Sequence, residues 1–185
     1  MAAIGTEPDG KAKFDRVVRP CLSDAFALAR WIAGNRADAE DILQEACLRA
    51  YRAIDGFSDG SARAWVLTIV RRTAYSWLHK NRSAAVVAID ELNTSDLARA
   101  ERGGDAGNPV ATPEAELIAK ADSALLESAI ASLPIEFRET LVLRDIQGLD
   151  YREIASVTAV PMGTVMSRLA RARQRLIQAI GTPQR

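Results

Sequence analysis

The sequence predicts an all-α protein with two small helical domains joined by an acidic, flexible linker. Apolar residues make up 48% of the 185 residues, and aromatic residues only 5%. Apolar positions recur at helical spacing along most of the chain, and no alternating pattern typical of strands appears. One interval rich in glycine, proline and acids separates two such helical stretches, as expected of a linker between domains.

The first predicted domain spans residues 11–82. Its first helix is expected from about Lys13 to Ala33, with a break or kink at Pro20, because proline cannot donate the helical hydrogen bond. Gly34 suits the end of this helix. The next helix is expected to begin at Asp38 and to bury one apolar side.

Charges on this second helix have a sufficient structural explanation. Acids near its start and arginines near its end suit the helix dipole. The loop 56–61 then leads into a third helix, which contains no acid from Arg71 to Arg82. Basic and aromatic side chains are interspersed along this helix: Trp65, Arg71, Arg72, Tyr75, Trp77, Lys80 and Arg82. Such a mixture can hold single-stranded nucleic acid, since phosphates need cations and unstacked bases need flat faces. Tryptophans, however, are more often core residues.

The predicted linker spans residues 83–116. It carries seven acidic residues against two basic ones, and glycines and prolines interrupt it. It could fold back on either basic surface or keep the domains apart.

The second predicted domain spans residues 117–181 and contains four helices. The second of these opens at Pro134 and is expected to turn four apolar side chains inward: Phe137, Leu141, Val142 and Ile146. A helix-turn-helix follows. Asp150 and Glu153 have the spacing of a capping box, and Pro161 marks the turn before the last helix.

The last helix, from Met162, has two distinct sides. Its apolar stripe contains Val165, Leu169, Ala172 and Leu176. Another face, at the same spacing, carries Thr164, Arg168, Arg171 and Arg175, with Ser167 beside them. No acid occurs from Met162 to the C-terminus. A helix of this kind can lie in a DNA major groove and reach phosphates and guanine edges. The alternative is a solvated surface helix whose cations favour its own dipole.

Several functional classes have no support in the sequence. There is no glycine-rich phosphate loop, no metal-ligand spacing and no nucleophile with a base, so we expect no catalysis, no cofactor and no small-molecule substrate. Cys21 and Cys47 are too few and too far apart for a disulfide framework. Without a signal peptide or a long apolar run, we expect a cytoplasmic protein without direct membrane insertion. Formal net charge is zero, so nucleic-acid binding must rest on local asymmetry.

Four stretches in this order resemble the extracytoplasmic-function (ECF) class of bacterial sigma factors. They are DAEDILQEACLRAYRAIDGF, ARAWVLTIVRRTAYSWLHKNR, LPIEFRETLVLRDIQGLDYREIA and MGTVMSRLARARQRL. The resemblance implies a dissociable subunit of bacterial RNA polymerase that binds promoter DNA and has no enzymatic activity of its own. It also implies an inhibitory anti-sigma factor as a partner.

The resemblance also implies three contact surfaces. The helix from Asp38 would dock on core RNA polymerase through Asp41, Gln44, Glu45, Leu48 and Arg52. The loop 57–62 and the helix after it would read the −10 element and capture a flipped base, with contacts from Arg71, Arg72, Tyr75, Ser76, Lys80 and Arg82. The last helix would read the −35 element. For that helix the resemblance favours Met166, Ser167, Ala170 and Arg171, whereas spacing alone favours Thr164, Arg168, Arg171 and Arg175.

Three positions depart from the family pattern in ways that bear on recognition. Relatives commonly carry Asn and Asp where this chain has Arg72 and Ser76, which suggests more phosphate contact here. A basic residue is common where Met166 stands. Two other interpretations remain open: a sigma-like decoy that sequesters an anti-sigma factor, and a stand-alone helix-turn-helix regulator.

Overall fold

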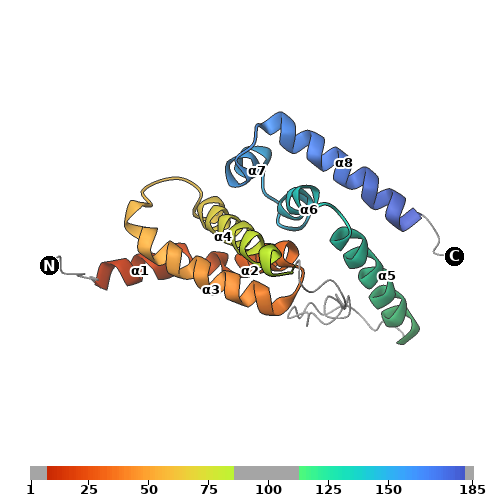
Figure 1. Cartoon of the computed structure of the whole chain (residues 1–185), viewed down its shortest axis with the longest axis horizontal. Helices are drawn as coiled ribbons and strands as arrows, with labels where there is room; N and C mark the ends of the chain where they lie inside the picture. The colour runs from red at the N-terminus through yellow and green to blue at the C-terminus, as the bar shows by residue number, and fades with distance from the viewer. Residues whose placement is uncertain (1–7, 86–112, 182–185) are drawn as a thin grey trace.

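The computed structural model describes residues 8–85 and 113–181, with side chains for residues 10–81 and 122–181. All regular structure in these ranges is helical, which confirms the predicted fold class. Most of the predicted linker lies outside the described residues. None of the helices described is both long and apolar enough to cross a membrane. Figure 1 shows helices α1 to α4 as one group and α5 to α8 as a second group beside it.

The first group consists of α1 (Pro8–Val17), η1 (Arg19–Cys21), α2 (Leu22–Ala33), α3 (Arg36–Ala53), η2 (Ile54–Gly56) and α4 (Ala62–Ala85). The predicted break at Pro20 is confirmed, because the short 3-10 helix η1 separates α1 from α2. Gly34 ends α2 with φ of 90°, a left-handed conformation that glycine adopts without steric cost.

The start of α3 differs from the prediction. Asn35 is its N-cap and accepts a hydrogen bond of 2.9 Å from the backbone N–H of Asp38. The helix therefore begins at Arg36, before the expected Asp38. Asparagine is among the strongest N-cap residues, and its side chain satisfies a backbone donor that the first turn leaves free.

The second group consists of α5 (Pro113–Ala131), α6 (Ile135–Leu141), η4 (Val142–Ile146), α7 (Tyr151–Thr158) and α8 (Met162–Gly181). The predicted capping box is present. The N–H of Glu153 donates to Asp150 Oδ1 at 2.8 Å, and the N–H of Asp150 donates to Glu153 Oε2 at 3.1 Å. Ala159 then closes α7 in the left-handed region, with φ of 56°, and this makes the turn of the helix-turn-helix.

One predicted core residue lies on the surface. Ile146 was expected to point inward, but it is 50% exposed. The reason is that α6 continues as a π-helical turn, η4, in which the N–H of Gln147 donates to Val142 O at 2.9 Å. Such a turn accommodates one extra residue and shifts the helical register. It turns Ile146 outward and buries Gln147 instead.

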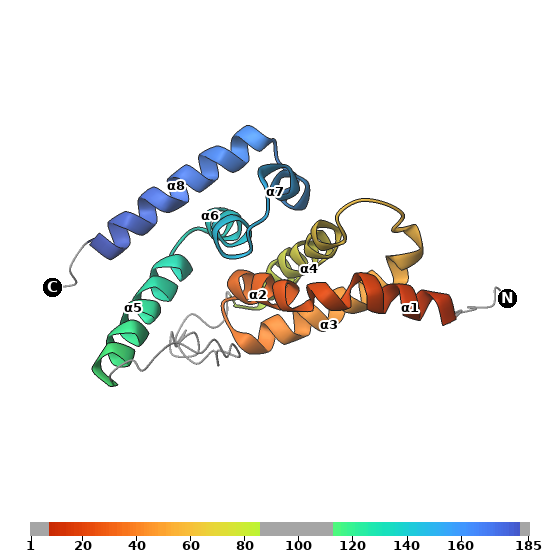
Figure 2. The same ribbon diagram turned by 180° about the vertical axis from the view of Figure 1, so that it is seen from behind.

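The two groups of helices pack against each other. Helix α4 lies against α7, and α2 lies against α6 and η4. Buried apolar side chains of both groups form one contiguous cluster. Figure 2 shows the same arrangement from behind, with α4 and α2 next to α6 and α7. Surfaces of the first group are therefore in contact with the helix-turn-helix domain.

Candidate nucleic-acid interface

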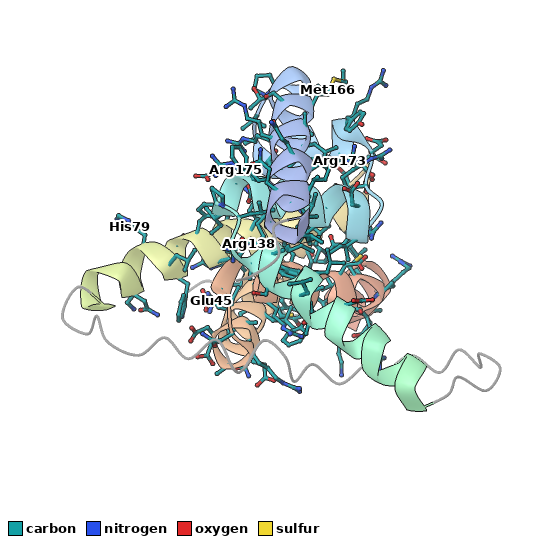
Figure 3. All side chains as sticks on the ribbon, turned by 90° about the vertical axis from the view of Figure 1, so that its right-hand side faces the viewer. Glu45, His79, Arg138, Met166, Arg173 and Arg175 are labelled. Carbon is teal, nitrogen blue, oxygen red and sulfur yellow. The ribbon has the colours of Figure 1, made fainter. Side chains whose placement is uncertain are left out.

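The outer face of α3 carries the predicted polymerase contacts. Asp41, Gln44, Leu48 and Arg52 are exposed. Leu48, a large apolar side chain, is 53% exposed. Glu45 is half-buried and pairs with Arg49 at 2.8 Å. In Figure 3 Glu45 lies far from Met166 of α8, so this face is separate from the outer end of the recognition helix.

The loop before α4 surrounds a hollow. The rings of Phe57 and Trp65 lie 5.1 Å apart and tilted by 43°. Around them is a hollow of about 640 Å³, which Arg72 of α4 also lines. Its far wall belongs to α7 and includes Arg152 and Glu153. Aromatic rings, two guanidinium groups and hydroxyl groups therefore surround a space that a nucleotide base could enter.

Helix α4 divides the predicted −10 residues into two sets. Arg72, Ser76 and Lys80 are exposed, and Ser76 Oγ donates to Arg72 O at 2.9 Å. Arg71 and Tyr75 are half-buried and face the second group of helices. The side chain of Arg82 lies outside the described residues. The expected core role of the tryptophans agrees with the structure, since Trp65 and Trp77 pack partly buried against the core, although Trp65 also lines the hollow.

Arg71 is bound to a residue that the sequence analysis did not single out. Its Nε donates to Glu139 Oε2 at 2.8 Å and its Nη2 donates to Glu139 Oε1 at 3.0 Å. Burial alone would lower the pKa of Arg71, but the hydrogen bonds and charge of Glu139 raise it above the usual value. Burial, followed by the charge of Glu139, raises the pKa of Tyr75 well above its usual value. Both side chains therefore keep their ordinary protonation states, cationic and neutral, at neutral pH.

A sequence signal for Glu139 does exist. Glu139 lies four residues after Ile135 and three before Val142, so it is on the side of α6 that carries apolar residues. An acid at such a position needs a buried cationic partner. The sequence could not identify that partner, because Arg71 lies 68 positions away.

The recognition helix α8 exposes one set of predicted −35 residues more than the other. Met166, Ser167, Ala170 and Arg171, favoured by the resemblance, are all exposed. The set favoured by spacing is partly engaged within the protein. Thr164 is half-buried, Arg168 Nη1 lies 3.7 Å from Glu139 Oε1, and the guanidinium of Arg175 lies 5.1 Å from the centre of the Phe137 ring. Arg171 belongs to both sets and has no hydrogen bond or ion pair with another described side chain.

Comparisons with known families match both halves of the chain. The family model Sigma-70 region 2 matches residues 17–84, and the model Sigma-70, region 4 matches residues 123–176. Among similar proteins, the ECF RNA polymerase sigma factor SigE of Mycolicibacterium smegmatis is 33% identical over 185 residues, covering 92% of this chain and 67% of that protein. The ECF RNA polymerase sigma-E factor of Escherichia coli K12 is 33% identical over 168 residues, covering 90% of this chain and 85% of that protein.

Solved structures share the fold. The sigma factor RpoE from Bartonella quintana, determined in complex with the anti-sigma factor NepR, aligns with a TM-score of 0.70 and 24% identity, covering 92% of this chain and 98% of that chain. CnrH, in complex with the cytosolic domain of CnrY, aligns with a TM-score of 0.62 and 22% identity, covering 92% of this chain and 89% of that chain. The two sigma-70 regions occur in sequence order, and the identity to two ECF sigma factors is 33% over nearly the whole chain. The chain therefore belongs to the ECF family of RNA polymerase sigma factors.

Proposed function

We propose that the chain is a promoter-specificity subunit of bacterial RNA polymerase with three working surfaces. The outer face of α3 binds core polymerase, the loop 57–62 with α4 binds the −10 element, and the exposed face of α8 reads the −35 element. The first two belong to a domain at 11–82 and the third to a domain at 117–181, joined by a linker at 83–116. Support for these bounds comes from the matched regions, 17–84 and 123–176.

The observation that carries the proposal is the hollow beside Phe57 and Trp65, with Arg72 at its edge. Opening a duplex costs base stacking, so a protein that holds an unpaired base favours the open state. Aromatic rings offer stacking faces and Arg72 offers a cation for the neighbouring phosphate. Residues Arg71, Tyr75, Ser76, Lys80 and Arg82 would extend this strand-binding surface along α4.

Reading of the −35 element needs only duplex binding. We assign it to Met166, Ser167, Ala170 and Arg171, which are exposed together on α8. Thr164, Arg168 and Arg175 would support the helix or contact phosphates. Neither DNA surface needs high affinity alone, because polymerase holds both at once and raises their effective concentration.

The proposal includes no chemistry by the chain itself. Sigma factors are non-enzymatic initiation factors, so the chain would act by binding alone, in the cytoplasm where polymerase and promoters are found. An inhibitory anti-sigma factor is part of the proposal, supported by the solved sigma factor RpoE, which shares this fold and was determined in complex with the anti-sigma factor NepR. It would cover α3 and the DNA-facing helices. An anti-sigma complex that binds core polymerase as tightly as the free chain does would contradict this.

The testing experiment combines co-elution with transcription. Purified chain is mixed with bacterial core polymerase, and the complex transcribes a genomic fragment library with and without the chain. We expect co-elution and new start sites preceded by two spaced sequence motifs. Tight binding to another small protein without polymerase binding would favour a decoy. Duplex binding without polymerase binding would favour a stand-alone regulator.

A further inference from the structure

Glu139 joins side chains of two helices, α4 and α8, that the proposed function assigns to different promoter elements. Its carboxylate receives two hydrogen bonds from Arg71 of α4, and Arg168 of α8 lies 3.7 Å away. The Glu139 side chain is 0% exposed, and those of Arg71 and Arg168 are 17% and 22% exposed. One buried carboxylate therefore holds a predicted −10 contact and a predicted −35 contact at the same time.

The bond to Glu139 occupies one of the two edges of Arg71 that DNA could use. The edge formed by Nε and Nη2 can bind a carboxylate or a phosphate in bidentate fashion, and here the carboxylate has it. In this arrangement Arg71 also lies over the Tyr75 ring, with its guanidinium 4.5 Å from the ring centre. Arg71 and Tyr75 are thus both turned toward the second domain. A DNA strand that contacts them along α4 would have to displace the second domain.

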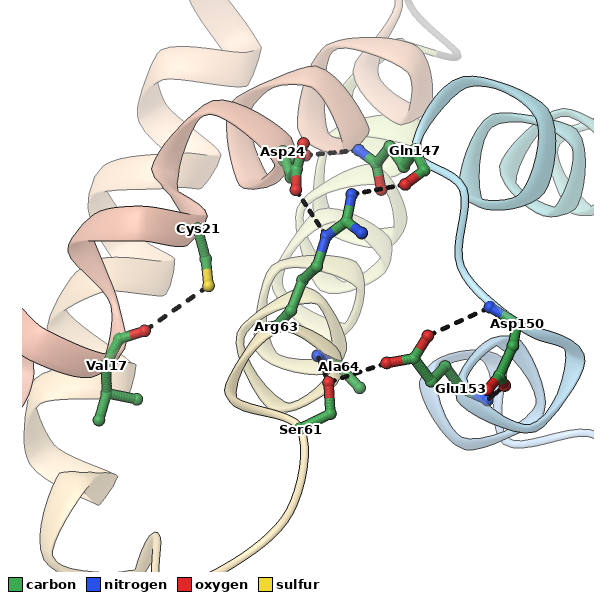
Figure 4. Close-up of polar contacts among 9 residues, drawn as sticks. All are labelled: Val17, Cys21, Asp24, Ser61, Arg63, Ala64, Gln147, Asp150 and Glu153. Carbon is green, nitrogen blue, oxygen red and sulfur yellow. Dashed lines mark hydrogen bonds and ion pairs between the residues drawn. The ribbon is translucent and has the colours of Figure 1, made fainter.

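Further polar contacts hold the same two domains together. Arg138 Nη1 donates to Trp31 O at 2.9 Å. Figure 4 shows a second group, in which Arg63 Nη2 donates to Gln147 O and Gln147 Nε2 donates to Asp24 O. Each contact joins a residue of α2 or α4 to one of α6 or the segment just after η4.

The −10 loop is tied down as well. Ser61 Oγ donates to Glu153 Oε1 at 2.9 Å, as Figure 4 shows. Because Arg152 and Glu153 form the far wall of the hollow beside Phe57, the second domain restricts access to that hollow. The same contact between domains therefore forms one wall of the base-binding space and engages Arg71 of α4.

We propose that this contact is an autoinhibitory latch, in which Glu139 of the second domain withholds Arg71 and Tyr75 of α4 from DNA until Arg71 is released. The inference rests on the proposed function, because it concerns the −10 surface assigned there. Arg71 exchanges the Glu139 carboxylate for a DNA phosphate when the latch opens. Glu139 then gains water, and Arg168 becomes free to turn toward DNA.

The polar character of the contact between the domains allows such a latch to open and close reversibly. Contacts between domains of one chain resemble transient protein interfaces, and this one contains charged groups that water can solvate after separation. A buried ion pair adds little net stability, but it requires a specific geometry, so it selects one arrangement of the domains. If only a fraction of free molecules is open, the apparent affinity for DNA falls by that fraction.

The test uses two latch variants and one matched control in the full chain. Glu139→Gln removes the charge that holds Arg71 and keeps the side-chain shape. Arg138→Gln removes the bond to Trp31 O and leaves every assigned DNA contact in place. Glu40→Gln breaks an exposed ion pair with Arg36 inside α3, so it controls for the chemical change alone. Circular dichroism melts establish that each variant is folded.

Two measurements on the proteins without polymerase then test the latch. Small-angle X-ray scattering gives the radius of gyration. Fluorescence anisotropy with a fluorescein-labelled oligothymidylate of about 20 nucleotides reports binding by the strand-binding surface of α4. We expect Glu139→Gln and Arg138→Gln to enlarge the radius of gyration and to bind the oligonucleotide about tenfold more tightly. Glu40→Gln should match the wild type in both.

An unchanged radius of gyration in both latch variants would overturn the proposal. So would a larger radius without tighter oligonucleotide binding, since the contact would then hold the domains without inhibiting. If Glu139→Gln proves unfolded, Arg138→Gln decides alone. Neither measurement needs polymerase or a promoter. If the wild-type chain fails to direct transcription, that result contradicts the proposed function. The scattering and anisotropy data would still test the latch.

Discussion

Arg173 of α8 and Asp145 of η4 form a bidentate ion pair, with Nη2 2.6 Å from Oδ1 and Nε 3.1 Å from Oδ2. The pair joins the recognition helix to the turn before the helix-turn-helix. Both side chains are partly exposed, so solvent screening keeps its contribution to stability below about 1 kcal/mol. Its larger effect is to occupy the donors of Arg173, whereas Arg171, two residues earlier, has no such partner among the described side chains.

This difference makes Arg171 and Arg173 a matched pair for testing the −35 assignment. Arg171→Ala should weaken binding of the polymerase complex to its promoter by about 1–3 kcal/mol, the usual loss for a base contact. Arg173→Ala removes the same charge from the same helix and should change promoter binding far less. A competition assay between wild-type and variant −35 sequences measures both effects. Equal losses for the two variants would indicate a general electrostatic effect instead of base contact.

Leu48 should matter for polymerase binding and not for folding. Because its side chain is 53% exposed, Leu48→Asp should leave the thermal melt nearly unchanged. Loss of an apolar contact at an interface should weaken the complex with core polymerase by roughly tenfold. Titration of labelled chain with core polymerase gives the dissociation constant.

The matched control for Leu48→Asp is Ser23→Asp, which adds the same charge at an exposed position of α2. It should bind polymerase like the wild type. Equal weakening by both variants would show that added negative charge, and not the outer face of α3, determines the result.

Arg72 should contribute a phosphate contact at the −10 element. Arg72→Asn removes the guanidinium group and should weaken binding of the polymerase complex to an unpaired −10 strand. The logarithm of the binding constant should also depend less steeply on the logarithm of salt concentration, by about 0.7 for one single-strand phosphate. Arg19→Asn, at an exposed position of η1, should leave the salt dependence unchanged. An unaltered slope for Arg72→Asn would show that its guanidinium does not reach a phosphate.

Ala159 offers a stability test of the turn in the helix-turn-helix. It is the one non-glycine residue with positive φ that the described residues contain. Glycine has no steric penalty there, although it gains freedom in the unfolded chain. Ala159→Gly should therefore raise the free energy of unfolding by about 0.5–1 kcal/mol. In α7 itself, Ala155→Gly should have the opposite sign, with a loss of about 1 kcal/mol. Thermal melts compare the two, and a destabilised Ala159→Gly would contradict the strain argument.

Local sequence rules predicted most of the helical framework. Pro20, Gly34 and the pair Asp150 and Glu153 each act through neighbouring backbone atoms, so their effects depend on residues close in sequence. The apolar stripe of α8 was predicted for the same reason. The register after Val142 was not, because a π-helical turn leaves no simple pattern in a single sequence.

Long-range pairing accounts for the remaining differences. The sequence indicated that Arg71 and Arg168 were basic residues on DNA-facing helices, but it could not reveal that both approach Glu139. That arrangement depends on how two domains pack, which periodicity within one helix does not encode. For the −35 surface, spacing favoured Arg168, which is partly buried beside Glu139, while the resemblance favoured residues that are all exposed.

The outward position of Leu48 and its neighbours on α3 has a kinetic consequence. These side chains are exposed while α4 is in contact with α7, so polymerase can capture the chain before the domains separate. Capture would then be a bimolecular encounter whose rate rises with polymerase concentration. Domain separation would follow as a unimolecular step on the polymerase surface. Holoenzyme assembly would consequently reach a plateau rate at high polymerase concentration, and that plateau would report the opening rate of the two domains.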